Sequence, residues 1–266
     1  MLESNMFEPA VFESTTFELV ARKLRQPHTR FKVCLAIDDV EIAEAQQLRY
    51  KVFATEMGAV LPTAHLELDI DAFDNLCDHL IVRDTLSGEV VGTYRILPPD
   101  AAAKSGYYSD QEFDLTRLHF LRPRMAELGR SCVHPDYRSG AVIALLWQGL
   151  ADYMVRHGFD YVVGCASISM ADGGHLAASV YRNVSSKHLS PAEWRAAPRN
   201  PLPLDALDNG TPGLPPPLIK GYLRLGAMVC GEPAWDADFN TADLLMLLPM
   251  QQINRSYMRH FIEKAR

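Results

Sequence analysis

A strand, a glycine-containing turn, a helix and a second strand follow one another in the middle of the chain. Glu127 to Val133 reads as a strand and runs into the turn residues His134 to Gly140. Ala141 to His157 then places apolar residues on one wide face at helical spacing and stops at Gly158. Because Tyr161 to Ser167 reads as a buried strand, this order predicts two parallel strands joined by a helix.

Segments on both sides of this unit predict a larger mixed sheet. The apolar spacing predicts a helix over Asp39 to Met57, with Asp38 or Asp39 as its cap. The strand-like runs His79 to Arg83 and Val90 to Leu97 flank a turn and predict an antiparallel hairpin. Further elements are expected at Pro216 to Gly226 (helix), Asp243 to Leu248 (strand) and Met250 to about Lys264 (helix).

The domain organisation follows from these elements. We expect one α/β domain over residues 36–266, with a mixed central sheet flanked by helices, preceded by an N-terminal extension over residues 1–35. Eight of the 17 prolines fall between Ser190 and Pro217, which predicts an irregular loop or lid over residues 190–217.

Composition excludes several classes of protein. The formal net charge of -7 argues against nucleic acid as a partner, because neutralising phosphates requires a basic surface. The longest apolar runs fall far short of the roughly 20 residues that a membrane-spanning helix needs. No basic segment followed by an apolar one stands at the N-terminus, so we expect no secretory signal and a cytoplasmic location.

The five cysteines do not predict a metal centre or a disulfide framework. Their odd number and scatter through strands favour reduced thiols. Cys77 and His79, like Cys132 and His134, lack the paired spacing of a zinc site and are expected to be core residues of strands. We therefore predict that no metal is bound.

The C-terminal segment carries a basic amphipathic pattern. This pattern fits peripheral contact with anionic lipid at the inner face of the membrane, or a terminal helix that packs on the domain. The residues concerned are Arg255, Tyr257, Arg259, Phe261, Ile262, Lys264 and Arg266.

The turn before the central helix is a candidate anion site. A strand-to-helix turn directs free backbone N–H groups outward, where a phosphate or a pantetheine amide can dock. Here the turn consists of Arg138, Ser139, Gly140 and Ala141. Glycine at such a turn is also commonly present for backbone geometry alone.

This region resembles the GNAT superfamily, whose acyl-donor site is a strand, a loop and the N-terminus of a long helix, matching Leu128 to Gly149. A second match is Tyr222, four residues before Gly226 near a helix end. The resemblance implies a GNAT-like fold and a tyrosine that protonates the departing thiolate. The alternative for Tyr222 is packing on the core.

Longer motifs resemble the ornithine N-acyltransferases. The resemblance implies an acyl carrier protein thioester as the donor, carried on phosphopantetheine, with no permanently bound cofactor. It also implies L-ornithine as the acceptor and lyso-ornithine lipid as the product. The matching segments are Phe73 to Leu80, Val91 to Leu97, Glu127 to Arg138, Pro216 to Ala227 and Asp238 to Thr241.

The chain is also similar to the acyl-homoserine lactone synthases. Their pattern of arginine, phenylalanine and acidic residues implies site positions at Arg49, Phe53, Asp71, Asp74, Arg95, Glu127 and Arg130. The match is incomplete, because Met57 to Leu66 lacks the tryptophan of that group. Two alternatives to ornithine acylation stay open: another acceptor amine, including the one that yields a homoserine lactone, and a non-catalytic module that binds an acyl carrier or lipid.

Glu127 is the candidate general base. The attacking amine must lose a proton, which a carboxylate can accept directly or through water, while Asp71 or Asp74 binds amine groups of the substrate. Arg95 and Arg130 could bind the substrate carboxylate, or pair with Glu127 in a structural salt bridge. Strict alternation places Glu127 and Arg130 on opposite faces, so their joint action predicts a β-bulge near Leu128 to Arg130.

Overall fold

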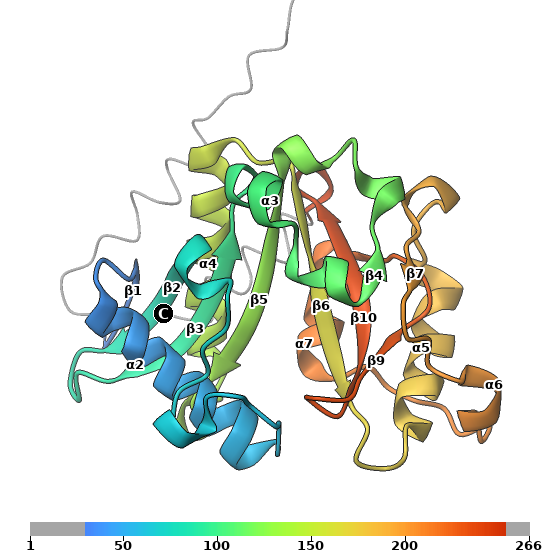
Figure 1. Cartoon of the computed structure of the whole chain (residues 1–266), viewed down its shortest axis with the longest axis horizontal. Helices are drawn as coiled ribbons and strands as arrows, with labels where there is room; N and C mark the ends of the chain where they lie inside the picture. The colour runs from blue at the N-terminus through green and yellow to red at the C-terminus, as the bar shows by residue number, and fades with distance from the viewer. Residues whose placement is uncertain (1–29, 254–266) are drawn as a thin grey trace, which may run out of the picture. The chain divides into compact units, whose positions relative to one another are not determined.

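The computed structural model describes residues 30–253, and these contain one mixed sheet with the strand order β1-β2-β3-β5-β6-β10-β8 and β9 beside β10 (Figure 1). Its strands are β1 (Phe31–Leu35), β2 (Asp78–Asp84), β3 (Val90–Leu97), β5 (Met125–Val133), β6 (Tyr161–Ser169), β8 (Met228–Val229), β9 (Ala234–Asp236) and β10 (Thr241–Pro249). The short strands β4 (Phe113–Asp114) and β7 (Ala197–Pro198) pair separately. Among the described strands of the large sheet, β5 and β6 run parallel and the other pairs run antiparallel.

Helices pack on the sheet. The α-helices are α2 (Asp39–Tyr50), α3 (Pro99–Ser105), α4 (Ala141–His157), α5 (His175–His188), α6 (Leu204–Leu207) and α7 (Pro217–Leu225), and α2 continues as the π-helix η1 (Lys51–Glu56). The 3-10 turns are η2 (Ala64–Leu66), η3 (Asp74–Leu76), η4 (Tyr108–Gln111), η5 (Thr116–Leu118), η6 (Arg122–Arg124), η7 (Pro135–Tyr137), η8 (Ala192–Trp194) and η9 (Met250–Gln252). None of the helices within residues 30–253 combines the length and the apolar character needed to cross a bilayer.

Alternation along β2 divides the core between two helices. Ile81 packs in a cluster with Ala45 of α2, whereas Leu80 and Val82 pack with Leu146 of α4. Successive side chains of a strand point to opposite faces, so α2 and α4 cover opposite faces of this part of the sheet. Another cluster joins α5 and α7 to β6 and β10.

The elements predicted around the central turn are confirmed. Helix α4 spans the predicted residues and ends at Gly158, which adopts a left-handed φ of 66° that glycine tolerates. The hairpin forms, with β3 as predicted and β2 one residue longer at each end. Asp38 caps α2 by accepting a 2.9 Å hydrogen bond from the N–H of Glu41.

The structure differs from the predicted elements at the N-terminal boundary, in and before the proline-rich stretch, and at the C-terminal end. Phe31–Leu35 pairs with β2 from Phe31↔Asp84 to Leu35↔Leu80, so the residues before 36 include an edge strand of the sheet. The proline-rich stretch over residues 190–217 contains η8, β7 and α6 rather than irregular loop alone, and α5 was not predicted. The expected helix from Met250 is in the structure a 3-10 turn, η9, that ends at Gln252, and residues 254–264 of that prediction lie outside the described residues.

The two parallel strands separate part of the way along their length. They pair from Met125↔Tyr161 to Glu127↔Val163 and then diverge (Figure 1). The register with β3 shifts between Cys132 and Gly129, and Arg130 in that interval adopts a left-handed φ of 50°. These features confirm the predicted bulge.

Gly164 permits the close approach of β6 to β5, and its replacement should be costly. A Cβ at Gly164 would lie 2.2 Å from the carbonyl oxygen of Leu128. Because main chain cannot yield like a flexible side chain, G164A should lower the free energy of unfolding by about 1–3 kcal/mol in denaturant titrations. G129A is the control: a Cβ there meets nothing within 4 Å, so it should change stability by less than about 0.5 kcal/mol. Equal effects of both substitutions would contradict the explanation that β6 approaches β5 closely because residue 164 has no Cβ.

Candidate active site

A cavity of about 650 Å³ lies where β5 and β6 separate. Gly129 and Ser131 of β5 line it on one side, and Ala166 and Ser167 of β6 line it on the other. All four follow the last paired positions of their strands. The divergence of the two strands therefore positions the cavity.

Most of the predicted site residues meet at this cavity. Its lining includes Phe53, Arg95, Glu127, Arg130, Arg138, Gly140 and Tyr222. Ser139 and Ala141 flank Gly140 in the turn but do not line the cavity, and neither do Arg49, Asp71 and Asp74.

Arg49 is enclosed by two carboxylates. It is 0% exposed, and its Nε donates to Asp69 Oδ2 at 2.9 Å while a terminal nitrogen donates to Asp74 at 2.8 and 3.0 Å. Asp74 also accepts from the N–H of Asp71 at 2.8 Å. These contacts occupy Asp74, so the predicted amine-binding role does not fit it, and both Arg49 and Asp74 support the wall of the site.

Two further arginines complete this ion-pair network. Arg95 donates to Asp71 at 2.6 Å, and Arg130 donates to Asp69 and Asp71, each at 3.1 Å. Burial raises the pKa of Asp71, but the hydrogen bond and charge of Arg95 outweigh it and hold that pKa below its usual value. Three arginines and three aspartates thus neutralise one another at the cavity wall.

Asp69 is the member of this network that the sequence reasoning missed. It bridges Arg49 and Arg130 and is only 2% exposed. A signal was present, because Leu68-Asp69-Ile70-Asp71 places acidic residues between apolar ones, and a buried carboxylate requires a cationic partner.

Glu127 is held by the turn η4. The N–H groups of Tyr108 and Ser109 donate to its two oxygens at 2.6 and 2.8 Å, and the Ser109 hydroxyl donates at 2.5 Å. It forms no ion pair with Arg95 or Arg130 within residues 30–253, so the alternative of a structural salt bridge is wrong. Burial raises the pKa of Glu127, although the hydrogen bonds from Ser109 oppose the shift. A carboxylate with a raised pKa is better suited to accept a proton near neutral pH.

Tyr222 lies on α7 at the cavity, four residues before the left-handed Gly226 that ends this helix. Its hydroxyl is hydrogen-bonded to the hydroxyl of Tyr94, and its ring centroid lies 5.8 Å from that of Trp147. Burial and the neighbouring Tyr94 raise the pKa of Tyr222. The phenol therefore keeps its proton and remains available as a donor.

The predicted donor turn begins α4 with free main-chain groups. Gly140 adopts a left-handed φ of 102°, and no side chain caps the helix. Arg138 forms a bidentate pair with Glu56 at 2.6 and 2.7 Å and donates to the Val133 carbonyl at 3.1 Å. This pairing fixes the guanidinium at the cavity mouth, where the N-terminal end of a helix dipole favours an anionic group.

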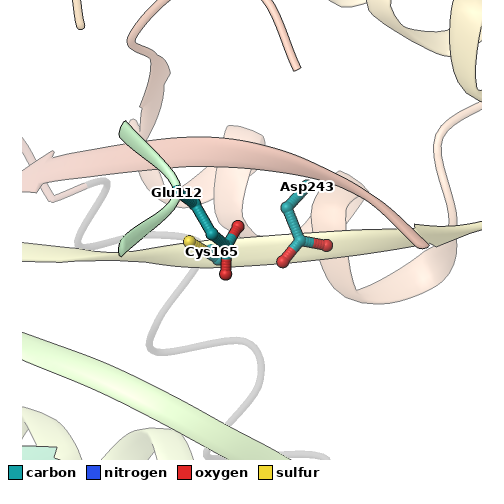
Figure 2. Close-up of side chains that lie close together, drawn as sticks. All are labelled: Glu112, Cys165 and Asp243. Atoms are coloured by element: carbon teal, nitrogen blue, oxygen red, sulfur yellow. The ribbon is translucent and has the colours of Figure 1, made fainter. Parts of the chain in front are cut away.

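A second acidic group lies at the β6 and β10 side of the cavity. Glu112 and Asp243 bring their carboxyl groups together beside Cys165, with the ligand atoms within 4.8 Å of one another (Figure 2). Burial, and then the charge of Asp243, raises the pKa of Glu112 to about 9. Neither Glu112 nor Asp243 was predicted as a site residue.

The raised pKa of Glu112 predicts a pH-dependent stability. The unfolded chain loses this proton near pH 4.5 while the folded protein keeps it up to about pH 9, so stability present at low pH falls as pH rises through this window. The slope for one proton is at most about 1.4 kcal/mol per pH unit, and E112Q should flatten it. Denaturant titrations at pH 6 and pH 8 without acceptor measure both slopes; identical slopes would contradict the assignment.

The chain is similar in sequence to known acyltransferases. The family model for an acetyltransferase (GNAT) domain matches residues 48–148. The L-ornithine N(alpha)-acyltransferase of Brucella abortus (strain 2308) is 38% identical over 251 residues, 88% of this chain and 89% of the relative. The enzyme of the same name from Rhodobacter capsulatus is 39% identical over 250 residues, covering 88% and 96%.

Solved structures support the fold. FeeM, an N-acyl amino acid synthase from uncultured soil microbes, matches with a TM-score of 0.53 at 13% identity, over 84% of this chain and 92% of that one. BjaI, a CoA-dependent acyl-homoserine lactone synthase, matches with a TM-score of 0.50 at 14% identity, over 90% of each chain. The predicted α/β GNAT-like fold and acyltransferase class are confirmed, and the chain belongs to the L-ornithine N(alpha)-acyltransferase family.

Proposed function

We propose that this protein moves a (3-hydroxy)fatty acyl group from acyl carrier protein to the α-amine of L-ornithine, giving lyso-ornithine lipid. The observation that carries the proposal is the match to ornithine N(alpha)-acyltransferases along most of both chains. The cavity supports it, because one space of about 650 Å³ is lined both by Gly140 at the N-terminus of α4 and by Glu127.

The donor thioester is proposed to enter at the α4 turn. The phosphopantetheine arm would dock its amides and phosphate on the main chain from Arg138 to Ala141, with Arg138 at the mouth. Its carbonyl would then lie in the opening between β5 and β6. Main chain at the bulge around Arg130 is our candidate for stabilising the oxyanion.

The chemistry requires three proton transfers. Glu127 takes a proton from the α-ammonium, directly or through water, so that the nitrogen can attack the thioester carbon. The C–S bond breaks as the tetrahedral intermediate collapses, and Tyr222 donates its proton to the departing thiolate. The nitrogen gives up its second proton in the same collapse, and that proton returns the Tyr222 phenolate to its neutral form. The substrate carboxylate is proposed to meet Arg95 and Arg130, whose guanidinium groups each carry five N–H donors, more than their ion pairs use.

Expression in a bacterial host that makes no ornithine lipid tests the proposal. Mass spectrometry of extracted lipids should find a new ornithine-containing lyso-lipid in cells with the native chain and not in cells with E127Q. A native chain that accumulates to the same level without producing such a lipid would contradict it.

We further propose that the protein is cytoplasmic and contacts the inner face of the membrane through the basic segment 255–266. These residues lie outside the described part of the chain, and the proposal rests on their charge pattern. Full-length protein should sediment with anionic phosphatidylglycerol vesicles, and a chain ending at residue 253 should not. Equal sedimentation of both would remove this role from the segment.

A further inference from the structure

The cavity has an acidic wall that the reaction steps above do not use. Asp243 and Asp236 line it, and Glu112 contacts Asp243 from outside the lining. Asp243 is 3% exposed and accepts a 2.9 Å hydrogen bond from the hydroxyl of Thr241. We call Glu112, Asp236 and Asp243 the acidic pole.

The acidic pole differs from the other acidic group of the site in its lack of cations. Asp69, Asp71 and Asp74 are each paired with arginine. Within residues 30–253, by contrast, no lysine, arginine or histidine forms an ion pair with a member of the acidic pole. Asp243 is buried, and Glu112 and Asp236 are partly buried. Carboxylates withdrawn from water are normally paired, so the acidic pole can accept a cation that the folded chain does not itself provide.

Glu112, beside Asp243, is a member of the acidic pole that also lacks hydrogen-bond donors. Both of its carboxyl oxygens are buried, and neither meets a hydrogen-bond donor in favourable geometry. Buried polar atoms are nearly always satisfied, so an orphaned carboxyl next to a cavity points to a ligand that donates hydrogen bonds. A primary ammonium group supplies three such donors and one positive charge.

The position of the acidic pole suits the far end of a diamine. Cys165, on β6 beside the acidic pole, lines the cavity together with Asp243 and Glu127. The same cavity wall thus approaches the proposed base at one place and the acidic pole at another. An amino acid with its α-amine at Glu127 can direct a side chain along β6 toward Asp243.

We infer that the acidic pole binds the side-chain ammonium of the acceptor and thereby selects a diamino acid over its monoamine analogues. This inference rests on the proposed function, and it adds the residues that recognise the δ-amine of ornithine. Asp243 makes the direct contact in the cavity, while Glu112 supplies a second carboxyl from behind it.

A divalent metal is the competing ligand for these atoms. Glu112, Asp243 and Cys165 offer ligand atoms close enough to share an ion. The ammonium fits better, because the Cys165 thiol is buried among carboxyls, which disfavours the thiolate that a metal would need. Elemental analysis of the purified protein separates the two, since a stoichiometric metal that disappears in D243N would overturn the inference.

The decisive measurement compares L-ornithine with L-norvaline, which has the same carbon chain but lacks the δ-amine. The ratio of kcat/KM for ornithine to that for norvaline should fall about 100-fold in D243N, because a buried ammonium loses its charged partner. E112Q should lower the ratio in the same direction, and it replaces D243N in the test if that variant does not fold. D152N is the matched control, since Asp152 on α4 is also a partly buried carboxyl with a raised pKa but does not line the cavity.

The outcomes separate this inference from the proposed function. If the native protein acylates ornithine but the ratio stays unchanged in folded D243N and E112Q, the acidic pole does not recognise the side chain. Equal native activity on ornithine and norvaline would also overturn the inference while leaving acyl transfer intact. Failure of the native protein to acylate ornithine at all would overturn the proposed function and the inference together.

Discussion

Replacing Glu127 with glutamine should lower kcat/KM for acyl transfer by about 10²–10⁴-fold, the usual contribution of a general base. Glutamine keeps the size of the side chain but cannot accept a proton at neutral pH. Because burial raises the pKa of Glu127, the native activity should rise with pH as this carboxyl ionises, and the E127Q variant should lose that limb of the pH profile. Steady-state rates from pH 5 to pH 9 measure both effects.

A structural role for Glu127 must be distinguished from a catalytic one, since its carboxylate also anchors η4. S109A provides the control, because it removes one hydroxyl hydrogen bond to Glu127 and leaves the carboxylate in place. We expect S109A to retain most of the activity and the rising limb of the pH profile. If S109A and E127Q lose activity equally, or E127Q keeps the native profile, Glu127 is not the base.

Replacing Arg49 with methionine should destabilise the protein by about 3–5 kcal/mol, the usual effect of removing one partner from a buried ion pair. Methionine fills much of the volume, but Asp69 and Asp74 would then lose the cation that each contacts within 3 Å. Chemical denaturation at pH 7 measures the change in the free energy of unfolding.

Arg83 offers a matched control for charge removal. It pairs with Glu41 and Glu44 at the surface, at 3.2 and 2.6 Å, and its side chain is 23% exposed. Surface pairs of this kind contribute at most about 1 kcal/mol, so R83A should have a small effect. Similar losses for R49M and R83A would show that the network around Arg49 adds no more stability than a surface ion pair.

Local signals explain why the centre of the fold was predictable. Helix α4 has a glycine at each end and an apolar face between them, so its limits follow from its own residues. The bulge followed from a conflict between strand alternation and the expected joint action of Glu127 and Arg130. In the structure, the left-handed φ of Arg130 interrupts the strict alternation of side chains along β5.

Features that depend on distant partners were harder to predict. Strand β1 is short, and it is stabilised by pairing with β2, which lies more than forty residues later in the chain. The acidic pole is assembled from the residue after η4, from β9 and from β10, beside Cys165 of β6, and no local pattern connects these segments. The same limit applies to the network of arginines and aspartates, whose members except Asp69 were expected but whose pairing was not.

The reaction itself is tested most directly with purified protein, a 3-hydroxyacyl thioester of acyl carrier protein, and L-ornithine. Tandem mass spectrometry of the product locates the acyl group, while a thiol assay follows release of the carrier. We predict ornithine-dependent thiol release matched by a product acylated on the α-nitrogen, with the δ-amine free. Acylation of the δ-nitrogen, or thiol release that does not depend on ornithine, would contradict the proposed reaction.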